Sequence, residues 1–141
     1  MVSTTCEYAL RALTHLARLP GEQAVLGRDL AARAGVPANY LSKILLMLRN
    51  AGIVTTARGT GGGYRLLKSA DEIRLLEIVE LIDGSKAKPA CLLDSGRECV
   101  DTDPCSAHEA WREVRAAYIR FLESTSLAAV SQLPARPHGS E

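Results

Sequence analysis

Residues 27–66, GRDLAARAGVPANYLSKILLMLRNAGIVTTARGTGGGYRL, decide the fold of this chain. They predict a short helix over 26–34 and a second helix over 38–50, separated by a tight turn. Ala31 lies where crossing helices leave room for only a small side chain, and Gly35 suits the positive φ that such a turn often needs. The apolar side chains of the second helix recur at helical spacing: Leu41, Ile44, Leu45 and Leu48. This stretch therefore predicts a helix-turn-helix.

A β-hairpin is expected directly after the second helix. Residues 53–57 are rich in β-forming side chains, a glycine run follows, and Tyr64 to Leu67 can pair back as a second strand. The glycine run resembles a nucleotide-binding loop, but no Lys-Ser or Lys-Thr pair follows it. Arg58 at its start fits the narrow negative groove of DNA, so the hairpin is interpreted as the wing of a winged helix-turn-helix.

Charge is divided unevenly between the two halves of the chain. The first 68 residues hold nine basic and three acidic side chains, whereas the remaining 73 hold eight and thirteen. A basic half with a helix-turn-helix indicates double-stranded DNA as a partner. The side chains expected to reach bases or phosphates are Arg28, Asn39, Tyr40, Ser42, Lys43, Arg49, Arg58, Thr60, Gly61, Gly62 and Tyr64.

The rest of the chain is mostly helical in pattern, so the expected class is mainly α with a small β-hairpin wing and a long C-terminal dimerisation helix. Further helices are predicted over 4–19, within 69–83, over 104–122 and over 126–133. The predicted units are a winged helix-turn-helix over 1–84, a cysteine-bearing loop over 85–103, the dimerisation and C-terminal helices over 104–133, and a disordered tail over 134–141.

Three of the four cysteines fall close together near the start of the long helix. The spacing is Cys91-x7-Cys99-x5-Cys105-x2-His108, and Cys105 and His108 are about one helical turn apart. Three thiols and an imidazole suit an iron–sulfur cluster or zinc. Long gaps favour the larger perimeter of a cluster over a zinc knuckle, and a thiol-only redox switch stays open.

Composition limits the remaining classes of function. The chain has 141 residues, of which 47% are hydrophobic and 23% charged, as in a single globular domain. It contains no apolar run long enough for a membrane span and its N-terminus does not resemble a signal peptide, so a cytoplasmic location is expected. No catalytic constellation stands out, and we expect no enzyme. A small redox protein that does not bind DNA is the rival class, but it leaves the helix-turn-helix unexplained.

Several motifs together resemble the Rrf2 family of bacterial transcription regulators, in its iron–sulfur branch. They are Glu7-Tyr8-Ala9-Leu10-Arg11-Ala12-Leu13, Leu41-x6-Leu48, Ala51-Gly52, Arg58-Gly59-x-Gly61-Gly62-Gly63-Tyr64-x-Leu66 and the three late cysteines. The resemblance covers about residues 1–133. It implies a repressor that responds to iron, iron–sulfur, redox or nitric oxide status.

The resemblance also implies a homodimer on a palindromic operator, with one [2Fe–2S] or [4Fe–4S] cluster per subunit. Cys91, Cys99 and Cys105 would hold the cluster. The fourth ligand is left open between His108, Glu7 from the other subunit, and Cys6 or solvent. The apolar stripe of the long helix is expected to form the dimer seam, through Trp111, Val114, Tyr118 and Leu122.

Overall fold

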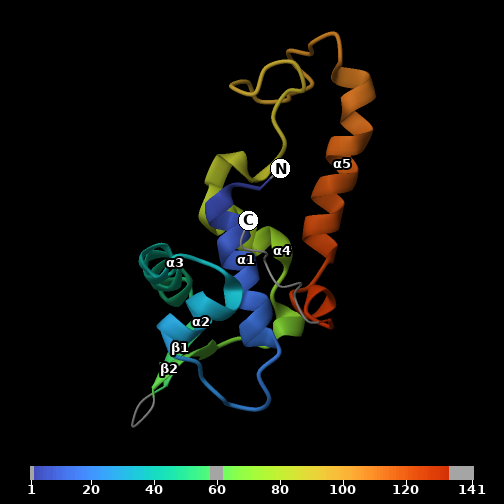
Figure 1. Ribbon diagram of the computed structural model, residues 1–141. Helices are drawn as coiled ribbons and strands as arrows, with labels where there is room; N and C mark the ends of the chain where they lie inside the picture. The colour runs from blue at the N-terminus through green and yellow to red at the C-terminus, as the bar shows by residue number, and fades with distance from the viewer. Residues whose placement is uncertain (1, 58–61, 134–141) are drawn as a thin grey trace.

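The computed structural model describes residues 2–57 and 62–133 and confirms a mainly helical fold with a two-stranded hairpin. The main elements, drawn in Figure 1, are α1 (Thr4–Ala17), α2 (Gly27–Ala34), α3 (Ala38–Asn50), β1 (Val54–Ala57), β2 (Gly63–Leu66), α4 (Leu75–Asp83) and α5 (His108–Ser124). Short 3₁₀ turns lie at Ala70–Glu72, Gly84–Ala87 and Ala128–Val130. The predicted tail over 134–141 lies outside the described residues.

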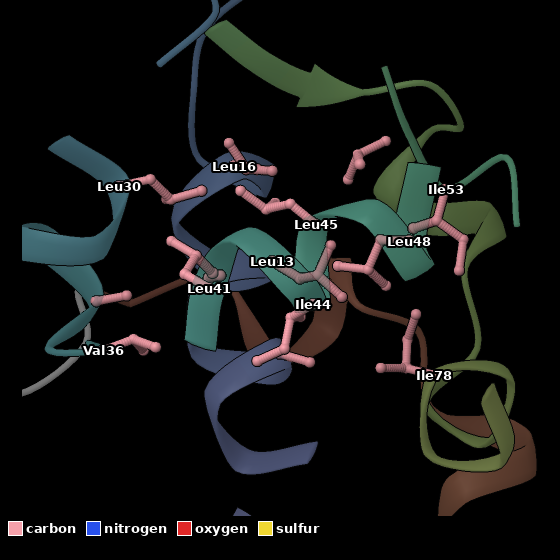
Figure 2. Packing of buried hydrophobic residues seen from close by; sticks show 14 of the residues in the cluster. Leu13, Leu16, Leu30, Val36, Leu41, Ile44, Leu45, Leu48, Ile53 and Ile78 are labelled. Carbon is pink, nitrogen blue, oxygen red and sulfur yellow. The ribbon is translucent and has the colours of Figure 1, made fainter. Parts of the chain in front are cut away.

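One hydrophobic core joins α1, α2, α3, the hairpin and α4. Side chains of α3 point into the space between α1, α2 and α4, and Figure 2 shows Leu41, Ile44 and Leu48 packed there. All three are fully or almost fully buried, as the predicted spacing requires. Gly35 ends α2 with φ +66°, which is the left-handed turn that the sequence predicted.

The hairpin is anchored at its base by an additional backbone bridge. Val54 pairs with Leu66 and Ala57 with Gly63 in an antiparallel register. Val25, just before α2, exchanges two backbone hydrogen bonds with Tyr64, of 3.0 and 2.7 Å. A Cβ on Gly63 would lie 2.5 Å from the Val25 carbonyl carbon, and Gly63 has φ +135°, so only glycine fits at this contact.

A second, smaller cluster joins α5 to the rest of the protomer. It contains Cys6 of α1, Leu75 and Val79 of α4, and Leu122 of α5. Ser3 caps α1 by accepting a hydrogen bond from the Cys6 amide, and its own amide donates to Asp83 at the end of α4. Helix α1 therefore takes part in both apolar clusters.

Two predicted helices differ from the structure, whereas the helix predicted within 69–83 is confirmed as α4. The long helix starts at His108 instead of Pro104, because the chain just before it forms a turn closed by the His108 N–H to Cys105 carbonyl bond of 3.1 Å. The predicted helix over 126–133 is only the turn Ala128–Val130. The backbone of Ser126 instead forms a bridge with Arg74, just before α4.

The cysteine-bearing segment lies at the opposite end of the molecule from the hairpin. In Figure 1 it passes over the top beside the first turns of α5, while α2, α3 and the hairpin lie at the lower left. The lower part of α5 packs beside α4. The hairpin and the cysteine-bearing segment, both predicted to be functional, therefore lie at opposite ends of the protomer.

Candidate metal centre and nucleic-acid interface

The segment between Cys91 and α5 is closed into a compact loop by polar contacts. The Cys91 amide donates to the Arg97 carbonyl at 3.0 Å. The Arg97 side chain in turn donates to the Asp103 carbonyl at 2.9 Å and forms an ion pair with the Asp103 carboxylate. These bonds fold both halves of the loop back on each other.

Two side chains of α5 attach this loop to the helix. The indole Nε1 of Trp111 donates to the Ala90 carbonyl at 2.9 Å, and Nε of Arg115 donates to the Pro89 carbonyl at 3.0 Å. Trp111, predicted to lie in a dimer seam, thus acts within its own protomer. The position of the first cysteine is therefore set by α5.

The predicted metal ligands come together as two pairs. Sγ of Cys91 lies 3.4 Å from Sγ of Cys105, and Sγ of Cys99 lies 3.6 Å from Nδ1 of His108. Within residues 2–57 and 62–133, no three His, Cys, Asp or Glu side chains converge as a single-ion site would require. The donor set, three thiols and one imidazole, has the chemistry that binds iron–sulfur clusters.

Asp101 completes the surroundings of His108 from the side opposite Cys99. Its Oδ1 lies 2.9 Å from Nε2 of His108, and Arg112 lies 4.0 Å from its Oδ2. The hydrogen bond with His108, followed by the charge of Arg112, lowers the pKa of Asp101 below its ordinary value. Asp101 and His108 also line a 460 Å³ cavity together with Cys99, Val100, Arg112, Arg115, Ala116, Ile119 and Arg120.

The cysteines differ sharply in their environment. Hydrogen bonds from the Leu93 backbone and from Cys105 lower the pKa of the Cys91 thiol. Burial, with a smaller contribution from Asp83, raises the pKa of Cys6 to about 12. Cys6 lies in the core on α1, so its side chain packs as a small apolar group.

Glu7 lies on α1 and is engaged there. Its carboxylate forms an ion pair with Arg11, whose guanidinium lies 5.7 Å from the centre of the Tyr8 ring. The Tyr8 ring is in turn 6.3 Å from the ring of Tyr40 on α3. Glu7 is thus connected to α3 through Arg11 and the two tyrosine rings, and within the described residues it forms no metal-binding group with Cys91, Cys99 or Cys105.

The outer face of α3 carries the predicted DNA-contacting side chains. Asn39, Tyr40, Ser42, Lys43 and Arg49 are all exposed, as is Arg28 on α2. The Ser42 hydroxyl donates to the Ala38 carbonyl at 3.0 Å, which leaves its oxygen available as an acceptor. Gly62 is described next to β2, whereas Arg58, Thr60 and Gly61 lie outside the described residues.

Tyr64 has a structural task at the base of the hairpin. It is half-buried, its backbone bonds to Val25, and its ring would be 3.4 Å from a Cβ on Gly27. These contacts fix the hairpin against the start of α2. Tyr64 therefore positions the wing, in addition to any contact with DNA.

The apolar stripe on α5 is divided between the two sides of the helix. Leu122 is buried and Tyr118 half-buried inside the protomer, whereas Val114 is 51% exposed. Phe121, which the sequence analysis did not select, is 48% exposed. The exposed apolar positions recur at steps of four, three and four residues: Ala110, Val114, Ala117 and Phe121.

Comparison with known families gives a match along nearly the whole chain. Residues 2–132 match Rrf2, described as an iron-dependent transcriptional regulator. The chain belongs to the Rrf2 family. The suspected resemblance is therefore confirmed, and with it the assignment to DNA-binding transcriptional regulators rather than to enzymes.

Named Rrf2 relatives come from several bacteria. An rrf2-like regulator of Rhodobacter capsulatus is 37% identical over 90% of this chain and 89% of its own length. The regulator IscR of Photorhabdus laumondii is 36% identical over 85% of this chain and 72% of its own length. The regulator NsrR of Geobacillus kaustophilus is 35% identical over 86% of this chain and 83% of its own length.

Solved structures of Rrf2 regulators share this winged-helix architecture. CymR (YrzC), the global cysteine regulator of B. subtilis, has a TM-score of 0.77 at 27% identity and covers 93% of this chain and 95% of its own. IscR of T. potens has a TM-score of 0.72 at 28% identity, covering 92% and 85%. An oxidised form of Staphylococcus aureus CymR has a TM-score of 0.72 at 25% identity, covering 96% and 99%.

Three features of these sites were missed by the sequence analysis. Asp101 contacts His108 from seven residues away in an irregular loop, where no periodicity marks it. Leu46 is 57% exposed on α3, three residues from Lys43 and therefore on the same face. The four-three-four steps of the exposed stripe on α5 could have revealed Phe121.

In the part of the chain that the structure describes, no helix is both long and apolar enough to cross a membrane.

Proposed function

We propose that this chain is a cytoplasmic, homodimeric repressor whose affinity for a palindromic operator is set by an iron–sulfur cluster. Cys91, Cys99, Cys105 and His108 would hold one cluster per subunit. The observation that carries this proposal is the pairing of Cys91 with Cys105 and of Cys99 with His108 in the segment that leads into α5. When bound, such a cluster supplies an iron centre that can respond to iron supply, oxidation or nitric oxide.

The arrangement in two pairs favours a binuclear cluster. Each iron of a [2Fe–2S] centre takes two protein ligands, and mixed thiolate and imidazole ligation is known for this class of cluster. Zinc requires four ligands around one point, and the described residues offer no such convergence. We therefore expect a [2Fe–2S] cluster in preference to [4Fe–4S] or zinc.

DNA binding would use α3 and the hairpin. Lys43 and Arg49 on the exposed face of α3 can neutralise phosphates, while Asn39 can read base edges in the major groove. In a dimer, two such helices would bind half-sites about one helical turn apart, roughly 34 Å. A palindromic operator follows from this symmetry.

The dimer seam would be the exposed stripe of α5. Val114 and Phe121 leave large apolar surfaces uncovered, and Ala110 and Ala117 between them allow a second helix to approach closely. This replaces Leu122 as the expected contact, because Leu122 is already covered within its own protomer.

Sensing and DNA binding would be coupled through α5. Trp111 and Arg115 attach the cysteine loop to this helix, and Leu122 attaches the same helix to α1 and α4. Occupation of the loop would therefore bias the dimer geometry. A coupling of about 1–3 kcal/mol would change operator affinity roughly 5–150-fold.

Anaerobic purification with iron, sulfide and zinc analysis tests the cofactor. We expect a coloured protein with iron and acid-labile sulfide in similar amounts, and an operator affinity that changes when the cluster is removed. A colourless protein that stays free of iron after anaerobic reconstitution would contradict the cluster. A protein that binds duplex DNA without dependence on salt or sequence would contradict the operator proposal.

A thiol switch is the second candidate, and the Cys91–Cys105 contact favours it. The two sulfurs need to approach only from 3.4 Å to about 2.05 Å to form a disulfide. Reaction with a hydroperoxide would convert two thiols and the peroxide into the disulfide, an alcohol and water. Mass spectrometry of the iron-free protein after hydroperoxide treatment would detect this bond, and an unchanged mass would exclude it.

A further inference from the structure

We infer that Asp101 is a positioning residue that holds the His108 imidazole with Nδ1 turned toward Cys99 and available to a metal. The inference rests on the proposed function only for the identity of that metal group. The orientation itself follows from the contacts of three side chains at the start of α5.

Hydrogen-bond chemistry decides which nitrogen of His108 carries the proton. The ionised Asp101 carboxylate can only accept, so Nε2, 2.9 Å away, must be the N–H donor. A neutral imidazole then has its lone pair on Nδ1. That atom faces Sγ of Cys99 at 3.6 Å, where the thiol can donate to it. Cys99 and Nδ1 are thus presented together on one side of the ring.

Burial makes this orientation difficult to change. The His108 side chain is only 7% exposed, and its backbone is fixed as the first residue of α5. Asp101 is 71% exposed and contacts the ring from the solvent side. The buried group is therefore the candidate ligand, and the surface group is the one that can be altered without opening the core.

A carboxylate behind a metal-binding histidine has a known physical effect. It fixes the ring tautomer and raises the basicity of the opposite nitrogen, and its loss typically weakens metal affinity 10–100-fold. Arg112, 4.0 Å from the second oxygen of Asp101, helps to hold the carboxylate in place. Asp101 contacts Nε2, whereas Cys99 contacts Nδ1, so the two groups lie at different nitrogens of the ring.

The first experiment measures the tautomer directly in the metal-free, reduced protein. Uniform ¹⁵N labelling and long-range ¹H–¹⁵N spectra distinguish Nε2–H from Nδ1–H in the neutral imidazole. His108→Gln assigns the signal among the three histidines. We expect the Nε2–H form in the wild type and a mixture of both forms in Asp101→Ala.

Glu109→Ala is the matched control. It removes the same charge from an exposed carboxylate that also lies near Arg112, at 3.9 Å. Within the described residues, the imidazole contacts Cys99 and Asp101 and not Glu109. We expect this variant to keep the wild-type tautomer. An Nδ1–H form in the wild type, or identical spectra for Asp101→Ala and wild type, would overturn the inference.

The second experiment measures how well the reconstituted protein retains iron against a chelator. Asp101→Ala should lose iron roughly 10–100-fold more readily than wild type or Glu109→Ala. Equal retention would show that His108 orientation does not serve the metal and would overturn the positioning role. Failure of the wild type to take up iron and sulfide would refute the proposed cofactor instead, and the tautomer spectra would still decide the orientation.

Discussion

The helix-turn-helix and the cysteine loop are held together by different kinds of interaction. Around α3, buried leucine and isoleucine side chains interlock with three other helices (Figure 2). In the loop, Leu92 and Leu93 are exposed, and the chain is fixed by hydrogen bonds to Trp111, Arg115 and Arg97. We expect apolar burial to give the helix-turn-helix one stable form, and the polar contacts to leave the cysteine loop easier to rearrange.

Replacing one cysteine of the loop and one cysteine of the apolar interior should give the largest contrast. Cys99→Ala should abolish the visible absorption of the cluster completely while the dimer stays folded, because no core helix depends on the loop. Cys6→Ala should keep the absorption but lower the free energy of unfolding by about 1 kcal/mol. Absorption spectra, iron content and chemical denaturation measure both. An unfolded Cys99→Ala chain would indicate a structural metal instead.

Replacing one leucine in each region should change the free energy of unfolding by very different amounts. Leu41→Ala leaves a cavity under the recognition helix and should lower the free energy of unfolding by about 2–5 kcal/mol. Leu93→Ala, at a side chain that is 63% exposed, should change it by less than about 0.5 kcal/mol. Urea denaturation followed by circular dichroism gives both values, and similar losses would contradict the contrast.

Substituting one glycine in the hairpin and one in the cysteine loop compares how tightly the backbone packs in the two regions. Gly63→Ala places a methyl group against the Val25 backbone at positive φ and should cost about 1–3 kcal/mol, with weaker operator binding. At Gly96 an added Cβ would have only an ordinary contact of 3.4 Å with Asp94. Gly96→Ala should therefore be close to neutral in thermal denaturation. A neutral Gly63→Ala would mean that the hairpin base can shift.

Removing one positive charge should weaken DNA binding when the charge lies on α3, but not when it lies in the turn after α4. Lys43→Ala should weaken binding to all duplexes and reduce the slope of log affinity against log salt by about 1, because one phosphate contact is lost. Lys86→Ala, in the turn after α4, removes the same charge and should leave this slope unchanged. Fluorescence anisotropy over a salt series measures both slopes, and the cluster absorption should be the same in both variants.

The smallest effect is expected at the attachment of the loop to α5. Trp111→Phe keeps an aromatic ring but removes the hydrogen bond to the Ala90 carbonyl, which is worth about 1 kcal/mol. Amide hydrogen exchange of residues 89–105 should become faster while that of α3 stays constant. Unchanged exchange in the loop would mean that Arg115 alone holds it.

The region held by apolar burial was easier to predict from sequence than the region held by polar contacts. The bounds of α3 were predicted correctly because the helical spacing of four apolar residues identifies its buried face: Leu41, Ile44, Leu45 and Leu48. The pairing of Arg74 with Ser126 joins segments 52 residues apart, so no local pattern could show that it replaces the start of the helix predicted over 126–133. The contact of Asp101 with His108 was equally hidden, because it depends on how an irregular loop closes.

The two tethers of the cysteine loop have a consequence for how this protein can diverge. Both Trp111 and Arg115 donate hydrogen bonds to main-chain carbonyls, at Ala90 and Pro89. These bonds therefore do not depend on the side chains at positions 89 and 90. Mutational drift at positions 89 and 90 leaves the attachment intact, whereas drift at 111 or 115 removes it. The attachment therefore depends on the identity of the two helix residues and not on that of the two loop residues that they contact.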